Sequence, residues 1–176
     1  MKQIDNFENV KANEGGFDRP APGAYIGVIL DAEDVPKKEY IKMNLDITEG
    51  DYKGYSFETL ERAGFCPLHS IRSYKETAIG FFKAFINAVE NSNEGYKWEW
   101  NEESLINKKI GFVIGEEEYE KNNGTIGERL YIDRLLSVDD VRAGKFKIPA
   151  KKLLEKKEAV VVESSDAEDN EDLPWV

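Results

Sequence analysis

The 176-residue chain contains one cysteine, Cys66, and one histidine, His69. A single cysteine cannot form an intramolecular disulfide, and these two side chains are too few ligands for a structural zinc site. A cysteine nucleophile assisted by His69 is an alternative that the pair leaves open. Pro67 and the neighbouring apolar residues favour ordinary loop packing instead.

Long apolar runs are also absent. No stretch approaches the roughly 20 consecutive apolar residues that a membrane-spanning helix needs. The first residues, Met1 to Asp5, lack the apolar run of a signal peptide. We therefore expect a soluble, cytoplasmic protein, in which the 40% of hydrophobic residues build the core of one domain.

Positive charge is scarce, because 24 Lys and Arg face 35 Asp and Glu, for a formal net charge of -11. A nucleic-acid binder must neutralise phosphates with Lys and Arg, so the balance argues against a broadly basic surface. Six acids and no base follow from Glu163 onward, which leaves a net charge of -5 on residues 1–162. Any nucleic-acid surface must therefore be a local groove.

Motifs for catalysis are missing as well. Two acidic clusters are present: Asp31, Glu33 and Asp34, and then Glu116, Glu117 and Glu118. Such clusters could hold Mg²⁺ in a nuclease, but in a chain this acidic they are more often solvated loop charge. No glycine loop is followed by the Lys-Ser/Thr pair that cradles phosphate. We expect no enzymatic activity, cofactor or metal.

Alternation of apolar and polar residues predicts strands in the first part of the chain. One face of a strand over residues 40–47 carries Ile41, Met43, Leu45 and Ile47. A partner strand over residues 23–30 is predicted to bury Ile26, Val28 and Leu30. Pro36 predicts a loop over residues 31–38, and the turn residues 49–51 precede a third predicted strand over residues 52–60.

A helix and two more strands follow. Ser73 and Glu76 have the spacing of a capping box, which predicts a helix from Ser73 to about residue 91. Its apolar face comprises Ala78, Phe82, Phe85, Ile86 and Val89. The fourth strand, over residues 108–115, is expected to bury Ile110, Phe112 and Ile114. The fifth, over residues 129–136, is expected to bury Leu130, Ile132 and Leu135. Residues 116–126 are interpreted as a charged excursion holding the hairpin signal Asn122-Asn123-Gly124.

This order predicts a mainly β fold with one helix: a five-stranded OB-fold barrel with the helix between the third and fourth strands. The predicted organisation is an N-terminal arm (1–21), the barrel domain (22–157) and a disordered acidic tail (158–176). Residues 137–157 are locally basic and are interpreted as wrapping the rim of the barrel.

Five segments, in this order, resemble a family of small phage and prophage proteins. The segments are Gly23-Ala24-Tyr25, Tyr52-Lys53-Gly54, Phe82-Lys83-Ala84-Phe85, Asn107-Lys108-Lys109-Ile110-Gly111 and residues 137–146. The family, formerly a domain of unknown function, is regarded as binding single-stranded DNA. The chain end also resembles the acidic C-terminus with which bacterial single-stranded-DNA-binding proteins recruit replication and repair enzymes, although Val176 follows Trp175 here. The residues that match this recruiting end are Asp172, Leu173, Pro174 and Trp175.

Exposed aromatics beside bases are the candidates for nucleic-acid binding, because bases of any identity stack on aromatic rings. The candidates are Tyr40, Lys42, Tyr55, Phe57, Tyr119, Lys121, Arg129 and Tyr131. Alternatively, Tyr55 and Phe57 belong to the core and Tyr131 covers a strand edge. The expected function is sequence-nonspecific binding of single-stranded DNA in phage DNA replication and recombination. The alternative is an OB-like adaptor of such a complex that does not bind DNA; homo-oligomers are compatible with either.

Overall fold

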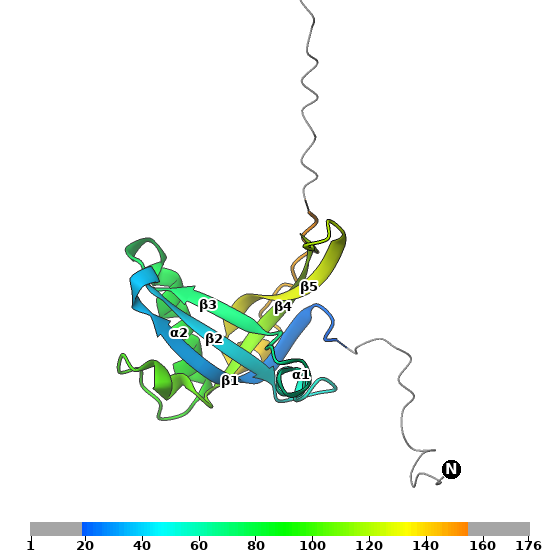
Figure 1. Cartoon of the computed structure of the whole chain (residues 1–176). Coiled ribbons are helices and arrows are strands. Elements are labelled where there is room, and N and C mark those ends of the chain that lie inside the picture. The colour runs from blue at the N-terminus through cyan, green and yellow to red at the C-terminus, as the bar shows by residue number, and fades with distance from the viewer. Residues whose placement is uncertain (1–18, 155–176) are drawn as a thin grey trace, which may run out of the picture.

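The computed structural model describes residues 19–154. In this part of the chain, five strands form one antiparallel sheet in the order β3-β2-β1-β4-β5 (Figure 1). The strands are β1 (Gly23–Val35), β2 (Tyr40–Ile47), β3 (His69–Ser73), β4 (Lys109–Glu120) and β5 (Ile126–Leu136). The prediction of a mainly β fold with five strands is confirmed, and the sheet is consistent with a barrel-like fold.

Three α-helices accompany the sheet in residues 19–154: α1 (Tyr55–Ala63), α2 (Ile79–Ser92) and α3 (Val138–Arg142). Short 3₁₀ turns occupy η2 (Pro36–Lys38), η3 (Glu76–Ala78) and η4 (Glu102–Leu105). The prediction of a single helix is therefore wrong in number, because α1 and α3 were not expected. α2 follows β3 and precedes β4 in the chain.

The predicted third strand over residues 52–60 is wrong. Gly54 has a left-handed φ of 82°, which turns the chain into α1, and the buried carboxylate of Asp46 binds the amide of Ser56 in the first turn. The third strand is β3 instead, which pairs with β2 from Asn44↔His69 to Tyr40↔Ser73. A long-range contact thus overrides the local alternation.

Strand β1 is longer than predicted. It continues to Val35 and pairs with β2 through the segment expected to be a loop, and Pro36 starts η2 just beyond the strand. A bulge between Ile29 and Asp31 shifts the register. The core face of β1 carries Ile29 before the bulge and Ala32 after it, whereas Val28 and Leu30, both predicted in the core, are only half-buried.

Strand β1 lies very close to its neighbouring strands at Gly27. A Cβ on this residue would lie 2.0 Å from the carbonyl oxygen of Asp46 and 2.6 Å from a ring carbon of Phe112. Only a residue without a side chain permits this approach of β1 to its neighbours.

The core lies between the curled sheet and α2, as the sequence pattern predicts. All four predicted positions of β2 are buried, as are Ile110, Phe112 and Ile114 of β4. Phe82, Phe85, Ile86 and Val89 of α2 are buried against them. The predicted capping box is not formed, because Ser73 ends β3 and its hydroxyl accepts from the amide of Lys75. Consequently Ala78 lies in η3, and α2 begins at Ile79.

Residues 116–126 are not an excursion but the continuation of β4 and β5. The turn forms where Asn122-Asn123-Gly124 predicted it: the amide of Lys121 donates to the carbonyl of Thr125, and the carbonyl of Lys121 accepts from the amide of Gly124. β1 pairs with β4 only as far as Ile114, so the two strands extend past the rest of the sheet (Figure 1). We call residues 115–131 the projecting hairpin.

Candidate nucleic-acid interface

One face of the projecting hairpin gathers four of the eight predicted site residues. Tyr119 lies opposite Gly127, Arg129 opposite Glu117, and Tyr131 opposite Gly115; alternate pairs of a ladder share one face. A Cβ on Gly127 would meet the side chains of both Lys121 and Tyr119, so Lys121 lies over the same face. The structure therefore brings Tyr119, Lys121, Arg129 and Tyr131 together.

A cationic side chain lies over the ring of each tyrosine. The guanidinium carbon of Arg129 lies 5.2 Å from the ring centre of Tyr119, and the ammonium of Lys152 lies 3.6 Å from that of Tyr131. Arg129 also forms an ion pair with Glu117 at 2.6 Å. We call Tyr119, Lys121, Arg129, Tyr131 and Lys152 the aromatic face.

Lys152 lies in a short segment that is hydrogen-bonded to β4. Its amide donates to the carbonyl of Glu116 at 3.0 Å, and its carbonyl accepts from the amide of Glu118 at 2.9 Å. These bonds hold the segment parallel to β4. The basic stretch 137–157 thus contributes one residue of the aromatic face, which the sequence analysis did not name because the pairing is long-range.

The opposite face of the hairpin is acidic, and three of its acids pair with two bases. Arg19 bonds to Glu116 and Glu128, and Lys151 bonds to Glu128 and lies 3.6 Å from Glu118. The hydrogen bond from Lys151 lowers the pKa of Glu128, and the same bond raises the pKa of Lys151. Because they are already paired, the acids of this cluster compete less with nucleic-acid phosphates for the nearby lysines and arginines than their number suggests.

Tyr40 and Lys42 lie apart from the aromatic face, on the outward side of β2. Lys42 is exposed and opposite Ile71 of β3, whereas Tyr40 is half-buried and opposite Ser73. In the sheet, β1 and β4 separate β2 from β5. These two residues could contact a ligand only on a different stretch of the surface.

Tyr55 and Phe57 are on α1 and not on the sheet, contrary to the predicted third strand. Tyr55 is half-buried and packs against the core, and burial raises the pKa of its hydroxyl. Phe57 is 50% exposed. Tyr55 thus fits the alternative of a core residue, whereas Phe57 presents a ring to solvent.

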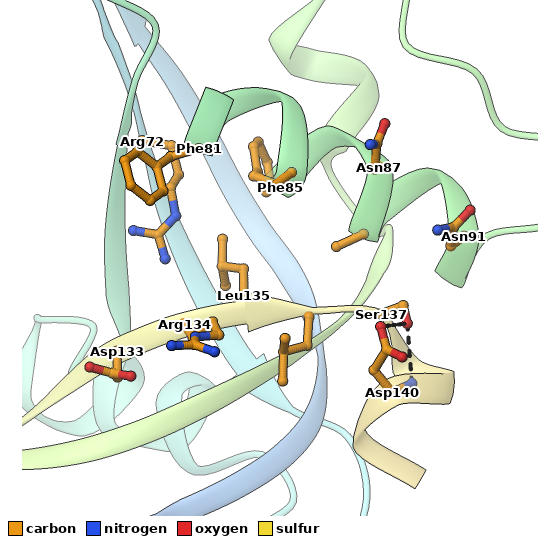
Figure 2. Close-up of a pocket in the computed structure, with 13 residues that line it drawn as sticks. Arg72, Phe81, Phe85, Asn87, Asn91, Asp133, Arg134, Leu135, Ser137 and Asp140 are labelled. Atoms are coloured by element: carbon orange, nitrogen blue, oxygen red, sulfur yellow. Dashed lines mark hydrogen bonds between the residues drawn. The ribbon is translucent and has the colours of Figure 1, made fainter. Parts of the chain in front are cut away.

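A cleft of about 670 Å³ lies between α2 and β5 (Figure 2). Arg72 of β3, Phe81 of α2 and Arg134 of β5 line it, together with Asn87 and Asn91. Phe81 is 77% exposed. Burial lowers the pKa of Arg72, and the nearby charge of Asp133 opposes the shift. At one end, Ser137 caps α3 by accepting from the amide of Asp140.

This cleft was not predicted from the sequence. Arg72 lies in a strand that was not predicted, and Arg134 was not distinguished from other strand residues. The available signal was Phe81, an apolar residue outside the spacing of the buried face of α2. An exposed aromatic and two arginines lining one cleft match the residue types that bind single strands.

Cys66 and His69 do not form a nucleophilic pair in the structure. The Cys66 thiol is half-buried and donates to the carbonyl of Leu68 at 3.4 Å, and burial raises its pKa. His69 is exposed on β3. A raised pKa disfavours the thiolate that such chemistry needs.

The predicted tail residues Asp172, Leu173, Pro174 and Trp175 lie outside the described residues, as does most of the predicted N-terminal arm. Among residues 19–154, no helix combines the length and apolar character required to cross a bilayer. In comparisons with known proteins, no family model matches this chain, and no curated protein matches it either.

Proposed function

We propose that this chain is an OB-fold protein that binds single-stranded DNA without sequence preference. The observation that carries the proposal is the aromatic face, where two tyrosine rings and two cations of the hairpin joining β4 to β5 lie together with Lys152 of the segment paired to β4. In OB-folds, the loop between the fourth and fifth strands is one of those that hold oligonucleotides. Phage DNA replication and recombination is the proposed setting, from the resemblance noted above.

The strand order supports the OB-fold assignment. β1 lies between β2 and β4, and α2 lies between β3 and β4 in the chain, as in a five-stranded Greek-key barrel. Among the described residues, no ladder joins β3 to β5. The cleft beside α2 lies next to this opening, which fits a partly open barrel.

A path for the strand follows β5. Val113 and Gly115 are two residues apart on β4, so their partners Arg134 and Tyr131 share the outward face of β5. A strand stacked on Tyr119 and Tyr131 could continue toward Arg134 and the cleft, where Phe81 offers a further ring. Arg129 and Lys152 would leave the rings as bases stack and, with Lys121, would pair with phosphates.

The test is a fluorescence-anisotropy titration of labelled oligo-dT at low and at high salt. Stacking contributes about 1–3 kcal/mol per base, so Tyr119→Ala with Tyr131→Ala should weaken binding about tenfold or more. Phe65→Ala, which removes an exposed ring elsewhere, is the matched control and should leave the affinity unchanged. Affinity should fall steeply with salt, because released counterions drive the binding.

The alternative is an OB-like adaptor in a replication or recombination complex that does not bind DNA. The acidic balance of residues 1–162 is the observation that favours it. No detectable binding of oligo-dT at low salt would reject the DNA proposal and leave the adaptor.

Recruitment by the chain end is a separate part of the proposal. Leu173, Pro174 and Trp175 would enter an apolar pocket of a replication protein, and the surrounding acids would steer the encounter. Trp175→Ala should abolish capture of replication proteins from a host extract and leave DNA affinity unchanged. Equal capture by both proteins would contradict this part alone.

A further inference from the structure

A second, smaller pocket lies away from the projecting hairpin. Its volume is about 240 Å³, and it is lined by Tyr74, Phe82, Trp98, Trp100, Asp34 and Glu102. These residues come from the end of β1, the segment after β3, the start of α2 and the connection that leads to β4. The pocket therefore shares no residue with the aromatic face or with the cleft beside β5.

Its walls are a continuous series of aromatic rings. The ring centres of Tyr74 and Phe82 lie 5.8 Å apart, those of Phe82 and Trp98 6.3 Å, and those of Trp98 and Trp100 6.3 Å. Phe82 is buried, whereas Trp100 is 77% exposed. The pocket thus has a closed aromatic base and an open aromatic rim.

The charge of the pocket is negative. Asp34 accepts a hydrogen bond of 2.8 Å from the hydroxyl of Tyr74, and Glu102 belongs to the same lining. Among residues 19–154, no lysine or arginine lines this pocket. Faces of aromatic rings and carboxylates both attract cations, so the two features favour the same ligand.

The backbone at the rim of the pocket also has an unusual feature. Trp100 has a left-handed φ of 61°, a conformation that bulky side chains rarely adopt and that clusters at binding sites. The carboxylate of Glu90 accepts a 3.0 Å hydrogen bond from the backbone amide of Trp98 and so fixes the backbone at that residue.

We propose that this pocket binds the side chain of one arginine of a partner protein. A guanidinium can stack on Trp100 and Trp98 while it pairs with Asp34 and Glu102. The volume is below the roughly 300–1,000 Å³ of small-molecule sites, which favours a single side chain. The phosphates of a nucleic acid would meet the two carboxylates and be repelled.

The pocket would be a protein-binding site on the described part of the chain, independent of DNA binding and of the tail. The site would let a partner with an exposed arginine dock while a DNA strand occupies β5. Specificity would come from the flat guanidinium, which fits between a ring and a carboxylate better than an ammonium does.

The test follows the indole ¹H–¹⁵N resonances of Trp98 and Trp100 in the full chain by NMR. The probes are acetyl-Gly-Arg-Gly-amide and its counterpart with citrulline, which has the same shape but no charge. The arginine peptide should shift both resonances in a saturable manner, and the citrulline peptide should not. Equal shifts by both peptides, or no shift at millimolar arginine peptide, would overturn the proposal.

Variants assign the effect to the pocket. Trp100→Ala should weaken peptide binding about tenfold, and so should Asp34→Asn combined with Glu102→Gln. Binding to these variants is measured from the Trp98 resonance, which all of them retain. Glu103→Gln, a neighbouring exposed carboxylate outside the lining, is the matched control and should bind normally. Amide spectra report whether each variant is folded, and Tyr74 retains an acceptor in Asp34→Asn.

Oligo-dT provides the last comparison. It should leave the Trp98 and Trp100 resonances unchanged, and Trp100→Ala should bind oligo-dT like the unmodified chain. If oligo-dT shifts these resonances and displaces the arginine peptide, the pocket belongs to a nucleic-acid site and the proposal is wrong. A chain that binds no DNA but still binds the arginine peptide would support the pocket and contradict only the proposed function.

Discussion

The carboxylate of Asp46, at the end of β2, accepts a 2.8 Å hydrogen bond from the backbone amide of Ser56 in the first turn of α1. The same oxygen accepts from the amide of Ile47 at 2.9 Å. Gly54, the N-cap residue just before α1, has no side chain to cap the helix. Asp46 therefore caps α1 from another element and joins the helix to the sheet.

Removing this carboxylate should destabilise the protein. Asp46→Ala leaves two buried amides without an acceptor, which costs about 1–3 kcal/mol. Asp46→Asn keeps the oxygen and should change the free energy of unfolding far less. Urea unfolding of both variants measures the difference, and equal losses would show that the charge is what matters.

Asp46 also predicts a pH dependence. Burial raises the pKa of its carboxyl, and the bonds from Ser56 and Ile47 oppose the shift only in part. Because the folded pKa lies above the unfolded value, ionisation disfavours the folded state. The stability contribution is therefore present below the unfolded pKa and is lost as pH rises through the folded pKa.

Asp46→Asn cannot ionise and should thus gain stability relative to the unmodified chain as pH rises through this window. The measurement is urea unfolding of both proteins at pH 4 and pH 7. A stability difference that stays constant, or that changes in the opposite direction, would contradict the assignment.

The same residue shows why the sequence predicts β2 but not its neighbour. Alternation identifies the buried residues of β2, because four apolar side chains at period two leave no other interpretation. Residues 52–60 also contain aromatics at strand-like spacing, yet Gly54 and the bond from Asp46 make them helical. Likewise the bulge after Ile29 exchanges the faces of β1, and no local pattern reports it.

The residues of the candidate interface also divide into those that the sequence could predict and those that it could not. Tyr119, Arg129 and Tyr131 could be predicted, because a hairpin with alternating residues fixes which side chains share a face. Lys152 could not, because it reaches Tyr131 through a pairing with β4 that depends on the whole fold. Arg72 could not either, because its position depends on which segment pairs with β2.

Two adjacent phenylalanines on α2 should differ sharply. Phe82 is buried at the centre of three ring contacts, whereas Phe81 is exposed. Phe82→Ala should cost about 3–5 kcal/mol of stability, as should Phe85→Ala. Phe81→Ala should stay within about 0.5 kcal/mol. Chemical unfolding checks all three, and similar losses for Phe81 and Phe82 would contradict the helix orientation.

Two glycines should respond to alanine in opposite directions. Gly27→Ala forces a methyl group against the carbonyl of Asp46, at the upper end of the roughly 1–3 kcal/mol that overpacking costs. Gly80, in α2, has open space around it and no left-handed φ, so Gly80→Ala should stabilise by about 0.4–1 kcal/mol. Thermal unfolding of both proteins measures the signs. Stability retained in Gly27→Ala would mean that β1 can move away from β2.

The segment beside β4 has a consequence for self-association. Beyond Ile114, β4 has no partner from β1, so without residues 151–154 the backbone groups of Glu116 and Glu118 would form an open strand edge. Such edges recruit strands from other molecules and start aggregation. By filling both hydrogen-bonding positions with its own backbone, Lys152 keeps the projecting hairpin from acting as a template for a second copy.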